Sequence, residues 1–234
     1  SPYEGSADLG IEVTSPSALA EGCRRAAAGG LAVAIHAIGD RAVRNALDAI
    51  EAPLKEGRGY PLPPRIEHVQ LIRSEDIGRF ASLGVLASVQ PIHQVSDRLM
   101  ARARWGARSE RSYAYGSLQK AKATLLLGSD APFDRAGPIR AIQAALLRRE
   151  PDEPDALSYH SEQRLRLAQA LRGHLETPHA AAGWATRLGR LEAGYGADLV
   201  HFDRDFCTLP IETWHHARVR GVWVGGKTEP FEKL

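Results

Sequence analysis

The strongest constraint on the fold is a short strand-like run that recurs four times in the first 150 residues, each time followed by a helical pattern. Runs of this length bounded by turn signals are typical of strands in a buried sheet, and apolar residues at 3.6-residue spacing are typical of helices. The alternation predicts an α/β fold with a parallel sheet. The expected strands cover residues 31–35, 65–67, 85–89 and 124–127.

The expected helices cover residues 18–28, 41–51, 74–83, 113–121 and 138–149. An arginine-rich segment at 92–110 is expected to form a long loop, and loops of such length are often functional. After residue 150 the pattern changes: two helices are expected at 161–172 and 178–184. A strand near residue 200 and a glycine-turn hairpin at 219–227 should then form a small β unit.

Composition excludes several classes of function. The net charge of +2 over 234 residues is too small to indicate nucleic-acid binding, and the basic residues are scattered. No apolar run approaches the roughly 18–20 residues that cross a bilayer, so no membrane partner is expected. Cys23 and Cys207 have no CxxC spacing, which favours a reduced cytoplasmic chain.

Metal-competent side chains follow the expected strands. His36, His68 and Asp130 each end a different strand. In parallel α/β folds the carboxyl ends of the strands build the site, and imidazole with carboxylate suits zinc, iron or manganese. Taken alone, each histidine is more often structural. Asp130 could instead cap a helix, but the next helix is expected to begin only near Pro138.

The remaining histidines carry weaker signals. His93, after the third strand, either binds substrate or lies at the surface. His215 and His216 are adjacent, and on a strand they would point to opposite faces, so they are not expected to share an ion. Four others belong to no constellation and are interpreted as structural or exposed: His160, His174, His179 and His201.

Five stretches, AIHAIGDRAV, RIEHVQ, ASVQPIHQVSD, LLLGSDAPF and LEAGYGADLV, occur in this order over nearly the whole chain. Together they resemble the third family of the amidohydrolase superfamily, which includes N-substituted formamide deformylases. The resemblance implies a metal-dependent TIM (β/α)8 barrel with a small β-sandwich. It implies that His36, His68 and Asp130 are metal ligands, that His93 binds substrate, and that Asp130 is also catalytic. The implied reaction is hydrolysis of an amide or formamide-like C–N bond by metal-activated water.

The chain also departs from that family. The His-x-His pair of the family's first strand and the lysine or glutamate of its fourth strand have no counterpart here. We therefore expect the carboxyl-terminal half of a barrel, strands five to eight, in residues 1–186, and part of the β-sandwich in residues 187–234. Divalent metal occupancy, most readily by zinc, should be partial or nil, and the fragment inactive or weakly active.

Two further expectations follow from half a barrel. The alternative function is a non-catalytic binding or assembly module; a nucleotide-cofactor domain is disfavoured because no G-x-G-x-x-G or P-loop is present. A half-barrel has two unpaired sheet edges. We expect a homo-oligomer, pairing with a missing amino-terminal half, or coverage of an edge by residues 1–16. The other expected partner is a small-molecule substrate.

Overall fold

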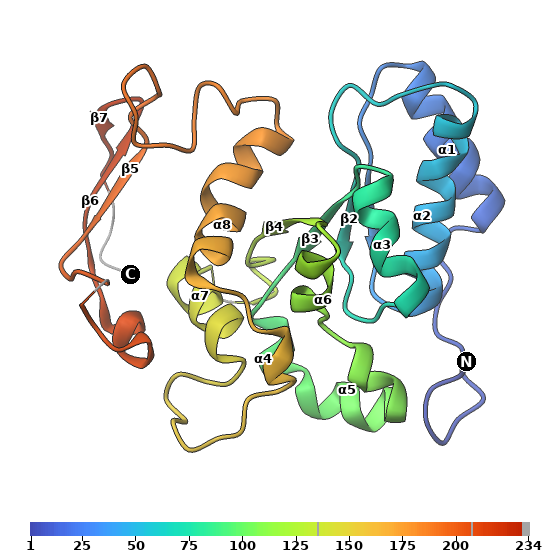
Figure 1. Ribbon diagram of the computed structural model, residues 1–234, viewed down its shortest axis with the longest axis horizontal. Helices are drawn as coiled ribbons and strands as arrows, with labels where there is room; N and C mark the ends of the chain where they lie inside the picture. Colours follow the sequence, from blue (N-terminus) through green and yellow to red (C-terminus); the bar gives the residue numbers. More distant parts are fainter. Residues whose placement is uncertain (135, 207, 231–234) are drawn as a thin grey trace.

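A four-stranded parallel sheet forms the centre of the protein, whose computed structural model describes residues 1–134, 136–206 and 208–230 (Figure 1). The strands pair in the order β1-β2-β3-β4. Their bounds are Ala34–Ala37 for β1, Arg65–His68 for β2, Leu86–Val89 for β3 and Thr124–Leu127 for β4. The predicted α/β fold with a parallel sheet is confirmed.

Helices pack against this sheet through apolar stripes. On α2, Val43, Leu47 and Ile50 recur at helical spacing and are fully buried. Burying each such side chain contributes roughly 1.5–3 kcal/mol. The α-helices are α1 Pro16–Ala28, α2 Asp40–Lys55, α3 Ser74–Ser82, α4 His93–Ser96, α5 Arg98–Trp105, α6 Tyr115–Lys120, α7 Pro138–Leu147 and α8 Leu167–Ala181. The 3₁₀ helices are η1 Gly106–Arg111, η2 Ser161–Gln163 and η3 Ile211–His216.

The first strand lies further along the chain than the sequence predicts. The apolar run at 31–35 was expected to be buried on both faces, but β1 spans Ala34–Ala37 and Leu31 is 63% exposed. Pairing with β2 begins at Ala34, opposite Arg65, and β1 has no second neighbour in the sheet. An edge strand has a neighbouring strand on one side only, so its residues are less buried than those of a central strand. The apolar run therefore did not mark the start of β1. His36 consequently lies within the strand.

The segment at 92–110 is helical and not the predicted loop. It forms α4, α5 and η1. Ala101 and Trp105 lie one turn apart on α5 and are both buried. They form a narrow apolar stripe of the kind that marks an amphipathic helix. The many arginines around it made the segment look like a polar loop in the sequence.

The two helices expected at 161–172 and 178–184 are also wrong. Residues 161–163 form η2, and one continuous helix, α8, runs from Leu167 to Ala181. Pro178 lies inside α8 but in its last turn. A proline there removes a hydrogen bond only near the helix end, so the helix is not broken where the sequence suggested.

A small antiparallel sheet lies at one end of the molecule, beyond α7 and α8 (Figure 1). It contains β5 Leu199–Phe202, β6 Val219–Val224 and β7 Lys227–Thr228, in the order β5-β6-β7. Gly225 and Gly226 join β6 to β7 with φ of 57° and 78°, a backbone that glycine adopts without cost. The predicted hairpin is confirmed. Cys23 is buried in α1, whereas Cys207 lies outside the described residues.

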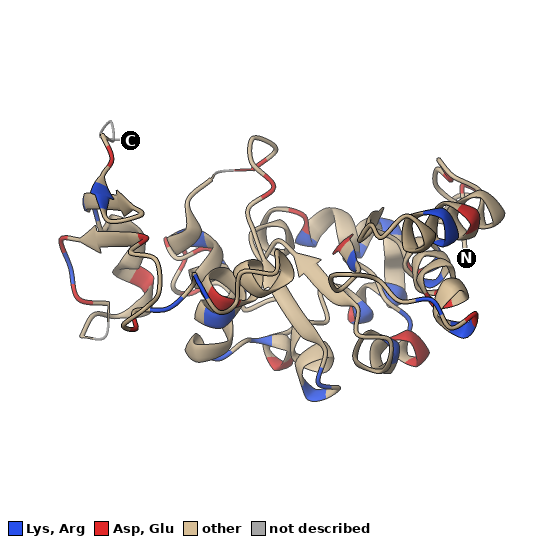
Figure 2. Cartoon of the chain, turned by 90° about the horizontal axis from the view of Figure 1, so that it is seen from above, with Lys and Arg blue, Asp and Glu red and all other residues tan. Residues whose placement is uncertain are grey.

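The two outer edges of the parallel sheet, at β1 and β4, pair with no other strand in the described part of the chain. Residues 1–16 do not cover either edge by strand pairing: the Glu4 amide donates to the Arg104 carbonyl (2.8 Å), and Arg108 donates to the Pro2 carbonyl (2.6 Å). The amino terminus therefore contacts α5 and η1. Lys and Arg positions are interspersed with Asp and Glu positions along the molecule (Figure 2). No described helix has the length and apolarity to cross a membrane.

Close packing of α8 on β4 requires Gly173. A Cβ atom there would lie 2.6 Å from Leu127 Cγ. Alanine is a better helix former than glycine by about 1 kcal/mol, but the clash with Leu127 should cost more than this gain. We therefore predict that Gly173→Ala has a net destabilising effect of about 1 kcal/mol or more. Gly22→Ala on α1, where no atom lies within 4 Å of the added carbon, is the matched control and should be neutral or stabilising. Urea unfolding of both variants measures this, and equal effects would contradict it.

His174 on α8 should make the fold sensitive to acid. Burial lowers its pKa from 6.5 to about 4, and its Nε2 has no hydrogen-bond partner in the described structure. The unfolded chain binds the proton first, so stability falls as pH drops from 6.5 towards 4, by on the order of 3 kcal/mol. Unfolding free energies at about pH 7 and pH 4 should differ less in His174→Leu than in the wild type. An unchanged difference would contradict this assignment.

Candidate metal centre

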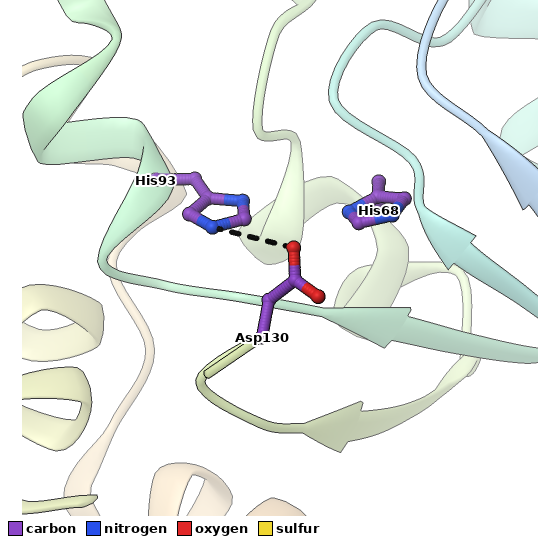
Figure 3. Close-up of side chains that lie close together, drawn as sticks. All are labelled: His68, His93 and Asp130. Atoms are coloured by element: carbon purple, nitrogen blue, oxygen red, sulfur yellow. Dashed lines mark ion pairs between the residues drawn. The ribbon is translucent and has the colours of Figure 1, made fainter. Parts of the chain in front are cut away.

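Three metal-competent side chains meet where the parallel strands end. His68 is the last residue of β2, His93 begins α4 just after β3, and Asp130 follows β4 (Figure 3). One ligand atom from each lies within 4.8 Å of the other two. Parallel pairing brings the carboxyl ends of the strands to the same edge of the sheet, so residues distant in sequence converge here.

Left-handed backbone directs two of these side chains. The φ angles are 76° at His68, 48° at Val69 and 60° at Asp130. Such conformations cost about 1–3 kcal/mol each outside glycine, and a β-branched valine adopts them rarely. The surrounding fold holds this strain in place at the two strand ends that carry the cluster, which is where strain occurs in functional sites.

His68 is held as a neutral imidazole. Its Nδ1 lies 3.0 Å from Gln90 Oε1, so Nδ1–H donates to the amide oxygen and Nε2 keeps its lone pair. Burial lowers the pKa of His68, and the nearby His36 also disfavours its charged form, whereas Asp130 and Gln90 act in the opposite direction. The ring is therefore uncharged at neutral pH, which is the form that binds metals.

His93 is almost fully buried, with 4% of its surface exposed. Its Nδ1 lies 3.4 Å from Gln70 Nε2, and the Tyr113 hydroxyl donates to Gln70 Oε1 at 3.4 Å. With the amide nitrogen at Nδ1, the ring proton stays on Nε2. A half-turn of the Gln70 amide would move that proton to Nδ1 and free Nε2 as a ligand. The Gln70 amide thus decides whether His93 donates or coordinates.

The cluster fits a divalent cation. His93 Nε2 is buried, has no hydrogen-bond partner among the described residues, and faces Asp130 Oδ2 at 3.9 Å, beyond hydrogen-bond length. A buried polar atom without a partner costs roughly 1–3 kcal/mol. Two imidazoles and a partly exposed carboxylate form a donor set that zinc accepts.

The predicted residue His36 lies beside this group. It is exposed on β1, and its ring meets that of His68 edge to face, with centroids 4.5 Å apart. Asp130 is not a helix cap, because the residue that caps α7 is Gly137. Sequence reasoning missed the supporting role of Gln70 and Gln90. The available signal was a glutamine at a strand end in RIEHVQ and in ASVQP.

The expectation for His215 and His216 rested on a wrong local structure. They lie on η3 and not on a strand, and their ring centroids are 4.1 Å apart. Successive residues of a 3₁₀ helix are about 120° apart around the axis, so adjacent rings can reach a common neighbour. That neighbour is Asp152, and the three form a second group of candidate ligands.

Known proteins resemble this chain over nearly its whole length. The model of the amidohydrolase family matches residues 2–228. Protein LONG AFTER FAR-RED 3 of Arabidopsis thaliana is 32% identical over 228 residues, which cover 94% of this chain and 38% of the relative. Putative amidohydrolase YtcJ of Bacillus subtilis is 28% identical and is covered to 42% of its length. The chain thus spans about two fifths of these relatives.

Solved structures of metal-dependent hydrolases are also similar to this chain. An uncharacterized metal-dependent hydrolase from Pyrococcus horikoshii OT3 is 32% identical with a TM-score of 0.76, covering 92% of this chain and 43% of that one. A similarly described hydrolase from Pyrococcus furiosus is 30% identical with a TM-score of 0.69, covering 83% of this chain and 38% of that one. The metal-competent cluster, the parallel sheet and the family match over residues 2–228 lead to one conclusion: the chain belongs to amidohydrolase family 3.

Proposed function

We propose that the chain provides part of the active site of a metal-dependent hydrolase that cleaves an amide or formamide-like C–N bond. The observation that carries the proposal is the convergence of His68, His93 and Asp130 at the ends of neighbouring parallel strands. Family membership and the relatives described as metal-dependent hydrolases support it. In this proposal β1 to β4 are strands five to eight of an eight-stranded barrel, and β5 to β7 are part of a β-sandwich.

Zinc is the proposed cation, with iron and manganese as chemically acceptable replacements. His68 would hold it through Nε2 while Gln90 fixes the ring, and His36 lies within contact of His68 at the same rim. An adenosine deaminase from Xanthomonas campestris, 18% identical with a TM-score of 0.62, shares the fold and is described with bound zinc. With His68, Asp130 and the neighbouring His36 as the only donors in the described part of the chain, and with His93 keeping its Nε2 proton, the affinity should be below that of a complete site.

A bound divalent cation would polarise the substrate carbonyl and acidify a water molecule. The chain's own contribution is proton transfer. The Asp130 carboxylate is 40% exposed and stands at the mouth of the site, where it can accept a proton from water and deliver it to the leaving nitrogen. His93 with its proton on Nε2 faces the same space and would donate to the substrate oxygen.

Two observations favour a different function for the chain taken alone. Both edges of the parallel sheet are open in the described structure, and no His-x-His pair occurs in the sequence. A half-barrel of this kind could serve as a binding or assembly module without turnover. The catalytic proposal requires Asp130 for proton transfer during hydrolysis, whereas the assembly module requires no catalytic residue.

Hydrolysis of N-substituted formamides and simple amides by the zinc-loaded protein tests the catalytic proposal. We expect weak turnover that a chelator abolishes, that zinc restores, and that Asp130→Asn lowers by roughly 10²–10⁴-fold. His201→Ala, an exposed histidine outside both candidate clusters, is the matched control and should keep full activity. Zinc-loaded protein that hydrolyses none of these substrates would favour the assembly module.

The open edges predict association. Unpaired backbone donors and acceptors at β1 and β4 favour pairing with a second copy or with the missing half of a barrel. Size-exclusion chromatography with light scattering should give a mass above 25.4 kDa for the isolated chain. A clean monomer at high concentration would contradict this expectation.

A further inference from the structure

We propose that Tyr113 is a positioning residue: through the side-chain amide of Gln70, it holds His93 with its ring proton on Nε2. The consequence for catalysis rests on the proposed function, in which this proton bonds the substrate oxygen. The consequence for the tautomer of His93 does not rest on it, because the tautomer can be observed in the protein without turnover.

The side chain of Tyr113 is fixed from several directions. It is fully buried, and it packs at centroid distances of 6.3–6.4 Å against three other aromatic rings, those of Trp105, Tyr115 and Tyr159. Its backbone N–H donates to the Gln70 carbonyl at 2.7 Å, and its φ of 50° is uncommon for a bulky aromatic residue. Backbone and packing together therefore place the hydroxyl beside the Gln70 amide.

The hydroxyl of Tyr113 determines which way the Gln70 amide points. Burial raises the pKa of Tyr113, and the nearby Asp97 raises it further, so the hydroxyl keeps its proton and can donate. It donates to Gln70 Oε1 at 3.4 Å, and the amide nitrogen then takes the other side, 3.4 Å from His93 Nδ1. An amide nitrogen only donates, so Nδ1 accepts and the proton of the neutral ring lies on Nε2.

Asp130 favours the same tautomer. His93 Nε2 is buried and faces Asp130 Oδ2 at 3.9 Å. A proton on Nε2 is attracted by this carboxylate, whereas a ring with its proton on Nδ1 would turn a lone pair towards it. Asp130 is 40% exposed, so solvent weakens its influence. The orientation of the buried Gln70 amide therefore contributes a separate part of the preference.

The two histidines of the cluster thus receive opposite tautomers. Gln90 presents its amide oxygen to Nδ1 of His68 at 3.0 Å, which leaves Nε2 with a lone pair, whereas Gln70 presents its amide nitrogen to Nδ1 of His93. Under the proposed function, His68 can then coordinate the cation while His93 donates to the substrate oxygen. Tyr113 maintains this difference in role because it holds the amide that decides the tautomer of His93.

A chain of hydrogen bonds in the opposite direction is the competing explanation. The Tyr113 hydroxyl also lies 3.4 Å from Asp97 Oδ2, and its single proton cannot bond two acceptors at full strength. If the proton went to Asp97, the Gln70 amide could turn over, donate to the Tyr113 oxygen and accept from Nδ1–H of His93. However, Asp97 is partly exposed, so water can bond its carboxylate instead. The reversed chain would also leave His93 Nε2 without a proton opposite Asp130.

Heteronuclear NMR of the metal-free full chain, labelled at the histidine ring nitrogens, reads the tautomer directly at about pH 8, where imidazoles are ordinarily neutral. The signal that disappears in His93→Ala assigns the ring. We expect the wild type to carry the proton on Nε2. Gln70→Glu calibrates the opposite form, because an ionised carboxylate only accepts and draws a ring proton to Nδ1.

Tyr113→Phe, which removes the hydroxyl and keeps the ring, should shift the tautomer ratio roughly fivefold towards Nδ1–H, the usual net effect of one hydrogen bond. Tyr115→Phe is the matched control: it removes the same group from a neighbouring buried tyrosine, whose hydroxyl donates to the Gln90 backbone carbonyl at 3.3 Å. It should leave the ratio unchanged. Asp97→Asn removes the competing carboxylate and should keep the proton on Nε2.

A wild-type protein with its proton on Nδ1, or equal tautomer ratios in Tyr113→Phe and Tyr115→Phe, would reject the proposal in favour of the reversed chain or of a purely structural tyrosine. If the zinc-loaded wild type hydrolyses formamides, kcat/KM of Tyr113→Phe should fall in proportion to the Nε2–H population that is lost, and an unchanged kcat/KM would contradict the catalytic consequence. A wild type without any hydrolysis would count against the proposed function, while the NMR result still decides the role of Tyr113.

Discussion

Parallel pairing of β1 to β4 is the constraint on which the rest of the structure depends. It brings the carboxyl ends of the strands to one edge, and there it gathers candidate donors from three separate segments. His68, His93 and Asp130 are distant in the sequence, yet their ligand atoms lie within 4.8 Å of one another. Without this register the same residues would be unrelated polar side chains, and no local motif could hold an ion.

The glutamines complete the arrangement. Gln90 fixes the tautomer of His68, and Gln70, itself contacted by Tyr113, faces Nδ1 of His93. Imidazole rings have two nitrogens, and only a partner on one of them determines what the other can do. The properties of the two histidines therefore depend on the buried side-chain amides of Gln70 and Gln90. These amides carry no charge and give only a weak signal in the sequence.

Much of the fold could be predicted because local patterns agreed with tertiary packing. The strand at 124–127 and the glycine hairpin follow directly from apolar runs and turn residues. The prediction failed where tertiary packing differed from the local pattern. Arginines around Ala101 and Trp105 made the helical segment look like a polar loop. Pro178 was expected to separate two helices, but it lies in the last turn of one. The convergence at the site could be expected from strand ends, but the contact between adjacent histidines on η3 could not, since it depends on a 3₁₀ geometry.

The left-handed backbone at His68 and Asp130 has a consequence for the lifetime of the protein. The folded chain holds this backbone strain and buries His93 Nε2 without a hydrogen-bond partner in the described structure, and both features cost stability. An ion that binds only the folded form then stabilises it by mass action, in proportion to the logarithm of its free concentration. Under the proposed function, a shortage of metal would therefore lower the folded fraction of the chain and expose more of it to proteolysis, apart from any effect on turnover.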